Sequence, residues 1–266
     1  MWLHGRSANT IAAYRRDVTR FFASAGRPLM QIQLADLQAF AASMPEVAPA
    51  TRARCLAAVK SLLSFARRMG YLTEDVGAAL RLEKPGAPPV ERILAEAEVS
   101  RMIGAAPNPR ERTVLRLLYG CGLRASEAAA LRRRDLTAHR RGGEARILGK
   151  GSKLRVVEIP PTLWRELQEL QSSPAPDAPV IIGADGRALT RKGIYRIVRR
   201  AARRAGLAQA VSPHWLRHSH ASHALDHGAP LPAVQQDLGH SSLTTTSRYL
   251  HKRAGDSSSK YVPGMN

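Results

Sequence analysis

The chain has 266 residues, with 41 Lys and Arg against 21 Asp and Glu, so its formal net charge is +20. Such an excess favours a polyanionic partner, nucleic acid first and an anionic membrane surface second, because each neutralised phosphate releases condensed counterions. No apolar run is long enough for a membrane span, the start lacks the apolar stretch of a signal peptide, and the widely separated Cys55 and Cys121 are typical of buried residues in a reducing, cytoplasmic protein rather than of a disulfide framework.

The first third of the chain predicts a small bundle of four helices. Apolar residues between Ile11 and Phe22 recur at helical spacing, and Asn9 or Thr10 is expected to cap this first helix. The other three helices are predicted at about 34–43, from Pro49 to a stop at Gly70, and at about 74–82.

A domain boundary is predicted where the chain runs EKPGAPPV, at 83–90. Three prolines and a glycine in this short stretch end any helix and favour a stiff, extended connector. The predicted organisation is therefore a helical domain at 1–83, a linker at 84–90 and a second domain at 91–266.

The second domain is predicted to be mostly helical with a small antiparallel sheet. Two short strands, at 145–148 and 155–159, flank a Gly- and Lys-rich hairpin turn at 149–153. Helices are predicted at about 96–104, 110–119, 161–171, 190–205, 213–227, 231–238 and 243–251. The fold class is thus mainly α, with an α+β second domain.

Four short segments of this domain carry residues suited to phosphate chemistry. In the first, CGLRASE, the chain turns at Gly122, and Arg124 stands where a new helix begins near Ser126. Unpaired N–H groups and the helix dipole add to a guanidinium charge there. In the second, GKGSK, Lys150 at the hairpin tip can extend into a groove. Taken alone, each of these residues is more often a solvated surface residue.

The third segment is SPHWLRH, where Ser212 and Pro213 are typical of a helix start. His214 and Arg217 are three residues apart, so they share one face of that helix and can contact one phosphate together. His214 and His218 also have a spacing that suits a metal ion. A third ligand is not evident, however, and we expect no metal site.

The fourth segment is LGHSSLTTTSRY. Gly239 is expected to end a helix, His240 to occupy the turn, and the Ser/Thr-rich stretch to cap a last helix that carries Tyr249 two turns further on. By itself, Tyr249 is more typical of a half-buried aromatic residue that anchors the last helix.

In combination, these segments resemble one known family. Gly-Leu-Arg-x-Ser-Glu, Gly-Lys-Gly, Pro-His-x-Leu-Arg-His and Leu-Gly-His follow one another, and a tyrosine stands nine residues after the last histidine. This order resembles the tyrosine recombinase (phage-type integrase) family, most closely its Xer-like branch. The opening NTIAAYRRD resembles the start of the family's N-terminal core-binding domain, which is SAM-like, so the likeness covers about 8–251.

The resemblance implies a role for each matching residue. The implied catalytic set is Arg124, Lys150, His214, Arg217, His240 and Tyr249. Tyr249 would attack a scissile phosphodiester, which leaves a 3′-phosphotyrosyl bond and a free 5′-hydroxyl. The two arginines would hold the non-bridging oxygens with His240, His214 would manage the proton of the nucleophile, and Lys150 would protonate the departing oxygen. Neither a metal nor another cofactor nor ATP is implied.

Supporting roles are predicted for a second group of residues. Glu127 is expected to orient Arg124, and His218 to support the site from behind. One face of the helix at 190–205 is predicted to contact the DNA backbone, a solvated face being the alternative. Its basic residues are Arg196, Arg199, Arg200, Arg203 and Arg204.

The implied partner is double-stranded DNA, bound by a homo-oligomer that forms a tetramer on paired sites. The tail after Tyr249 contains Gly255 and Pro263, so we expect no long helix that docks on a neighbour, and the spacing of Tyr261 does not fit a nucleophile. Two alternatives stay open: a relaxing topoisomerase of the related single-strand type, and a catalytically silent DNA-binding relative.

Overall fold

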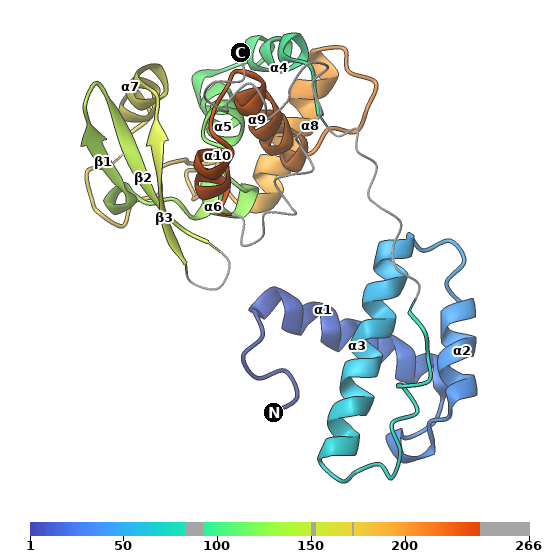
Figure 1. Cartoon of the computed structure of the whole chain (residues 1–266). Helices are drawn as coiled ribbons and strands as arrows, with labels where there is room; N and C mark the ends of the chain where they lie inside the picture. Colours follow the sequence, from blue (N-terminus) through green and yellow to red (C-terminus); the bar gives the residue numbers. More distant parts are fainter. Residues whose placement is uncertain (83–92, 150–152, 172, 240–266) are drawn as a thin grey trace, which may run out of the picture. The chain divides into compact units, whose positions relative to one another are not determined.

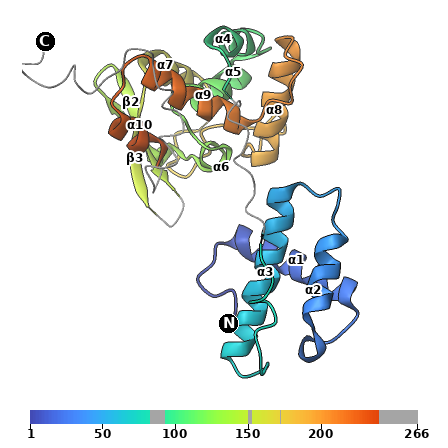
Figure 2. The same cartoon turned by 45° about the vertical axis from the view of Figure 1, so that its right-hand side comes forward.

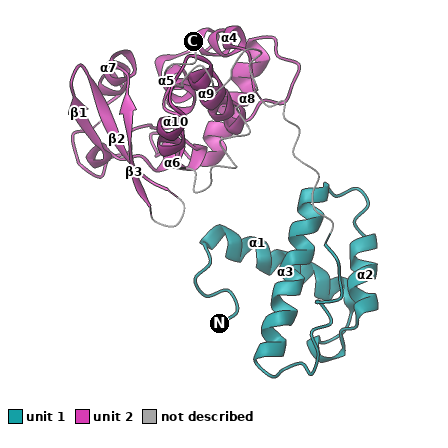
Figure 3. Ribbon diagram, viewed as in Figure 1, with its two compact units in different colours: residues 1–89 teal, residues 90–266 magenta. Residues whose placement is uncertain are grey.

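The computed structural model describes residues 1–82, 93–149, 153–171 and 173–239. The chain divides into two compact units, Met1–Pro89 and Val90–Asn266 (Figure 3). The predicted linker at 84–90 and the predicted helix at 243–251 lie outside the described residues. None of the helices in the described ranges has the length and apolarity that a membrane crossing requires.

Residues 1–82 of the first unit form three α-helices and one short 3₁₀ helix (Figure 1). These are α1 (Ala8–Ala25), the 3₁₀ helix Leu29–Gln31, α2 (Leu34–Ala42) and α3 (Pro49–Arg68). The prediction of a cap at Asn9 or Thr10 was wrong, because Ser7 is the N-cap and its side chain accepts the N–H of Thr10 at 3.2 Å. Phe21, Leu37 and Phe40 lie at the centre of the core.

The predicted fourth helix at 74–82 does not form, and the described chain makes turns there instead. Asp75 explains the difference. One of its carboxylate oxygens accepts the N–H of Gly77 at 3.1 Å, and the other accepts the hydroxyl of Ser64 on α3 at 2.8 Å. An aspartate that bonds the backbone two residues on closes a turn in place of a helix.

The second unit combines a helical layer with a small sheet (Figures 1 and 2). Its α-helices are α4 (Glu96–Gly104), α5 (Pro109–Gly120), α6 (Ala125–Ala130), α7 (Pro161–Glu169), α8 (Arg191–Arg204), α9 (Pro213–Asp226) and α10 (Leu231–Leu238). A 3₁₀ turn at Arg133–Asp135 leads into the sheet. The core joins both layers, from Leu115 on α5 and Leu216 on α9 to Ile147 and Ile159 of the sheet.

The sheet has three antiparallel strands in the order β1-β2-β3. They are β1 (Leu136–His139), β2 (Gly142–Leu148) and β3 (Leu154–Ile159). The last two were predicted, whereas β1 was not. Helix α7 packs on the sheet, because a Cβ atom at Gly143 would lie 2.1 Å from the ring of Trp164. The start of β3 lies beside α10 (Figure 2).

Candidate active site

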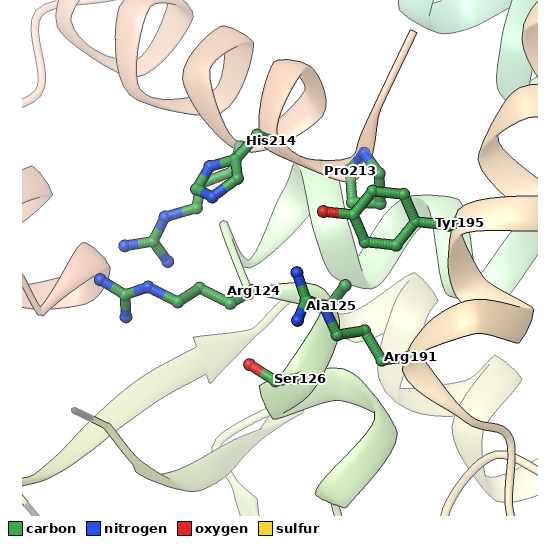
Figure 4. A pocket seen from close by; sticks show the side chains of 8 residues that line it. Arg124, Ala125, Ser126, Arg191, Tyr195, Pro213 and His214 are labelled. Atoms are coloured by element: carbon green, nitrogen blue, oxygen red, sulfur yellow. The ribbon is translucent and has the colours of Figure 1, made fainter. Parts of the chain in front are cut away.

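One pocket of the second unit is formed where three helices begin (Figure 4). Its lining residues are Arg124, Ala125, Ser126, Arg191, Tyr195, Pro213, His214 and Arg217. Arg124 is the N-cap residue of α6, and the other residues lie in the first two turns of α6, α8 and α9. Unpaired N–H groups and the positive ends of the helix dipoles add to the arginine charges, so the pocket suits an anion.

Arg124 reaches this pocket because of a tight turn. Helix α5 ends at Gly120, and Gly122 adopts a φ of +59°, in the left-handed region that favours glycine. A Cβ atom at Gly122 would lie only 2.8 Å from the ring of His220, so the turn also needs the missing side chain. Arg124 then becomes the N-cap residue of α6, with its side chain 29% exposed. The predicted turn and helix start are confirmed.

Glu127, which was predicted to orient Arg124, is almost fully buried. Its carboxylate accepts the backbone N–H of Arg124 at 2.8 Å and one guanidinium N–H of the same residue at 2.8 Å. Burial alone would raise the pKa of Glu127, but hydrogen bonds from Arg155 and Arg124 outweigh it and lower that pKa to about 2. Glu127 is therefore a carboxylate at any physiological pH, and its contacts fix the direction of Arg124.

Arg217 is buried beneath the pocket, with 2% of the residue exposed. Its guanidinium donates to the backbone carbonyl of Gly122 at 2.5 Å and to that of Leu238, and one nitrogen lies 3.9 Å from the Glu127 carboxylate. One side chain on α9 thus contacts the turn before Arg124 and the end of α10. These contacts hold Arg217 in one orientation.

The histidines of α9 lie in different surroundings. His214 is exposed and lines the pocket, and its ring stacks on that of His218 with 5.5 Å between centroids. His223 is buried and shares a hydrogen bond of 2.9 Å with the hydroxyl of Tyr119. Among the residues that the structure describes, no group of three or more His, Cys, Asp or Glu is placed to hold a metal ion.

Arg155 on β3 belongs to the same cluster, and the sequence interpretation missed it. Two of its nitrogens donate to the two carboxylate oxygens of Glu127, at 2.9 and 2.8 Å. The signal was the spacing, because Arg155 stands two and four residues before Val157 and Ile159 in the predicted strand, and the structure buries all three on one side of β3. A charged residue at an inward position of an alternating strand indicates a buried partner.

Arg191 and Tyr195 at the start of α8 were also missed. The Arg191 guanidinium carbon lies 5.5 Å from the centroid of the Tyr195 ring, and both side chains face the pocket (Figure 4). Arg191 and Lys192 occupy the first turn of α8, which contains no acidic residue. Basic residues are unfavourable beside the positive end of a helix, so their presence there was a usable signal for an anion site.

The five arginines of the predicted basic face on α8 are all exposed. Two of them already have a partner, because Arg200 and Arg204 donate to the buried carboxylate of Glu111 on α5, at 2.7 and 3.3 Å. The face is therefore divided into two paired arginines and the outward set Arg196, Arg199 and Arg203.

Three predicted site residues, Lys150, His240 and Tyr249, lie outside the described residues. The structure describes the chain up to two of them. The N–H of Gly149 donates to the carbonyl of Lys153 at 2.8 Å, as a hairpin requires. Gly239 ends α10 as predicted, with a φ of +61°.

Three guanidiniums, those of Arg124, Arg155 and Arg217, thus surround the Glu127 carboxylate at the base of the pocket, which leaves positive charge in excess. Because guanidiniums stay charged at any relevant pH and present forked donors, the arrangement can hold the oxygens of a phosphate group. His214 adds an imidazole ring, which can accept or donate a proton.

Comparison with known proteins agrees with this chemistry. The model of the phage integrase family matches residues 92–255, and that of the phage integrase N-terminal SAM-like domain matches residues 3–70. The chain is 37% identical to tyrosine recombinase XerC of Rhodospirillum centenum, over 93% of this chain and 80% of the relative. It is 30% identical to tyrosine recombinase XerD of Listeria monocytogenes, over 93% and 89%.

Solved structures show the same fold. XerH site-specific recombinase bound to its difH substrate before cleavage matches with a TM-score of 0.71 and 24% identity, over 91% of this chain and 75% of that one. The Tn1549 transposon integrase in complex with circular intermediate DNA matches with a TM-score of 0.77 and 17% identity, over 97% and 94%. The matches of both domains and the Xer relatives lead to one conclusion: the chain belongs to the phage integrase family of tyrosine recombinases.

Proposed function

We propose that the chain is a site-specific DNA recombinase that cuts and rejoins DNA through a covalent bond to Tyr249. The observation that carries the proposal is the pocket in which Arg124, His214 and Arg217 meet at the starts of α6 and α9. Glu127 fixes the first of these arginines there, and positive charge remains in excess. The relatives named above are recombinases and an integrase, which favours recombination over topoisomerase activity.

In this proposal the phosphodiester binds between the arginines. Arg124 and Arg217 contact its non-bridging oxygens, assisted by His240, while the Tyr249 hydroxyl attacks phosphorus. The new bond joins the tyrosine oxygen to the 3′ phosphate, and the bond to the 5′ oxygen breaks. Lys150 gives that oxygen a proton. A 5′-hydroxyl from the partner duplex then reverses the reaction, so the bond energy is kept and the strands are exchanged.

The electrostatics of the pocket suit a tyrosine nucleophile. A free phenol has a pKa of about 10, so forming its anion at pH 7 costs about 4 kcal/mol. Nearby guanidiniums lower that cost, and proton removal by His214 during the attack avoids much of it. Fixed donors beside the phosphate each contribute about 3 kcal/mol to lowering the barrier. Arg217, which is buried and held by main-chain carbonyls, is such a fixed donor.

The proposed partner is double-stranded DNA. The outward arginines of α8, Arg196, Arg199 and Arg203, would contact its backbone and position it without reading its sequence. XerH and λ integrase are known as DNA complexes, the latter as a dimer. By extension, this chain is proposed to bind DNA as a homo-oligomer that forms a tetramer on two paired sites. It is proposed to act in the cytoplasm.

Trapping of the covalent intermediate tests the proposal. A bound sequence is first selected from a pool of random duplexes. A nicked suicide duplex carrying that sequence is then incubated with the full chain, so that cleavage releases a short fragment and leaves protein on the DNA. We expect an adduct that migrates slowly in a denaturing gel and that is lost in Tyr249→Phe.

Tyr261→Phe is the matched control, because the same hydroxyl is removed from the same tail, and it is expected to form the adduct normally. An adduct that persists in Tyr249→Phe would show that the nucleophile is another residue. Rapid relaxation of a supercoiled plasmid that lacks the selected sequence would instead favour a topoisomerase. DNA binding with no adduct in the parent chain would indicate a silent relative.

A further inference from the structure

Arg155 occupies a place in the second unit that an ordinary core residue could fill. It stands at an inward position of β3, in line with Val157 and Ile159, which belong to the hydrophobic core. Only 9% of the residue is exposed. A buried guanidinium costs several kcal/mol in lost hydration unless its N–H groups find partners. The groups that bond to Arg155 therefore indicate its role.

The contacts of Arg155 connect three elements. Two nitrogens form a bidentate pair with Glu127 on α6, at 2.9 and 2.8 Å, and Nε donates to the carbonyl of Asp237 on α10 at 2.6 Å. Gly239 packs closely on the same side chain, because a Cβ atom there would lie 3.1 Å from Cδ of Arg155. The planar fork of the guanidinium fixes these distances more tightly than a lysine could.

The partner of Arg155 is the group that orients Arg124. The same Glu127 carboxylate accepts from the backbone and from the guanidinium of Arg124, and it lies 3.9 Å from Arg217. The hydrogen bonds of Arg155 are the largest cause that lowers the pKa of this carboxylate against the effect of its burial. Arg124 and Arg155 both donate to the Glu127 carboxylate, so Arg155 can act on Arg124 through Glu127.

We propose that Arg155 is a positioning residue for strand cleavage: with Glu127 it sets the orientation of Arg124 towards the scissile phosphate, and it fixes the end of α10 from which residue 240 follows. This inference rests on the proposed function. Arg155 does not line the pocket and need not touch DNA. Its loss should thus slow the chemical step and leave the affinity for DNA nearly unchanged.

The test measures single-turnover cleavage of the nicked suicide duplex at saturating protein, with the dissociation constant determined separately by fluorescence anisotropy. Arg155→Lys keeps the charge but loses the fork. We expect its cleavage rate to fall about 100-fold, the size of effect that a displacement of about 1 Å in a reacting group produces. The dissociation constant should stay within a factor of about 3, as for changes at distant, uncoupled sites.

A kinetic double-mutant cycle separates positioning from simple stabilisation. Since Arg155 is proposed to act through Arg124, the step from Arg to Lys at 155 should cost much less in an Arg124→Lys background than in the parent chain. An equal cost in both backgrounds would overturn the proposal, and so would a cleavage rate in Arg155→Lys equal to that of the parent chain.

Arg116→Lys is the matched control, because Arg116 forms an ion pair with Glu166 in the same unit without contacting the pocket. It should cleave at the parental rate. All variants are assayed at a temperature where circular dichroism shows them folded. Should Arg155→Lys not fold at any temperature, Glu127→Asp shortens the same bridge from its other end and must show the same split between rate and affinity. Failure of the proposed function is distinguishable, because then the parent chain forms no adduct.

Discussion

Two buried carboxylates in the second unit have the same chemistry and different surroundings. Glu111 accepts from Arg200 and Arg204, whose side chains are 49% and 42% exposed and lie one turn apart on α8. Glu127 accepts from Arg124 and Arg155 and lies near Arg217, and the side chains of these three come from three elements and are 29%, 7% and 3% exposed.

The difference lies in how much structure each carboxylate organises. Glu111 joins α5 to α8, and its arginines can turn towards water if the pair is broken. Glu127 joins α6, β3 and α9 at the base of a pocket, and two of its three arginines have little access to water. The same kind of pairing therefore joins two helices at Glu111, whereas at Glu127 it forms the base of a site for an anion.

The largest expected difference between the two regions is the loss in free energy of unfolding when each carboxylate is removed. Glu127→Gln leaves buried guanidiniums without their counter-charge, and we expect a loss of about 3–5 kcal/mol in the free energy of unfolding. Glu111→Gln should cost about 1 kcal/mol, because its half-exposed arginines can be hydrated. Urea unfolding followed by circular dichroism measures both. Equal losses would show that the burial of the arginines does not decide the effect.

The pH dependence of the same measurement sharpens this result. The pKa of Glu127 falls from 4.5 to about 2 on folding, so its ionised form is favoured in the folded state. Its contribution, on the order of 3 kcal/mol, is fully present above pH about 4.5 and is lost as the pH falls towards 2. The difference in unfolding free energy between the parent chain and Glu127→Gln should shrink over that window. A constant difference from pH 6 to pH 2 would contradict this account.

The next largest difference between the two regions is expected in the rate of DNA cleavage. Arg124→Ala removes a fixed donor from the pocket, and the single-turnover rate on the nicked suicide duplex should fall about 100- to 1000-fold. Glu111→Gln should cleave at the parental rate, since it affects only the connection between α5 and α8. If Arg124→Ala cleaved normally at saturating protein, the phosphate would have to bind elsewhere.

The smallest expected effect concerns the basic face of α8. Each of Arg196→Ala, Arg199→Ala and Arg203→Ala should lower the slope of log affinity against log salt by about 0.9, if each arginine neutralises one phosphate. Arg200→Ala should change the slope less, because Glu111 already balances part of its charge. Titration of a random duplex at several salt concentrations measures the slopes. A larger change in Arg200→Ala than in the other three would assign the DNA contact to the paired arginines.

Strong periodicity and clear end signals made most of the fold predictable. Helices α4 and α10 have the predicted bounds, since apolar spacing and a stop such as Gly239 agree there. The segment 74–82 failed because its outcome depends on Asp75, whose side chain bonds Gly77 and Ser64 in place of allowing a helix. A tertiary contact of that kind has no periodic signature.

The pocket was predictable only in part, for a related reason. Arg124, His214 and Arg217 stand in local motifs at helix starts, so spacing alone was enough to single them out. Arg155 and Glu127 are 28 residues apart, and no local pattern links them. Arg191 and Tyr195 were missed although the basic first turn of α8 indicates an anion site. A residue such as Arg155 is found by asking which charged positions of a strand face inward.

The main-chain partners of Arg217 have a consequence for how this pocket tolerates mutation. Its guanidinium donates to the carbonyls of Gly122 and Leu238, and a carbonyl is present whichever amino acid occupies a position. Substitutions at these acceptors therefore cannot delete the bond; they can only displace the backbone that carries it. An apolar substitution of similar size at the buried position 238 should therefore keep the bond while the end of α10 keeps its path, whereas a transplant of the pocket into another scaffold must carry both backbone segments along with the arginine.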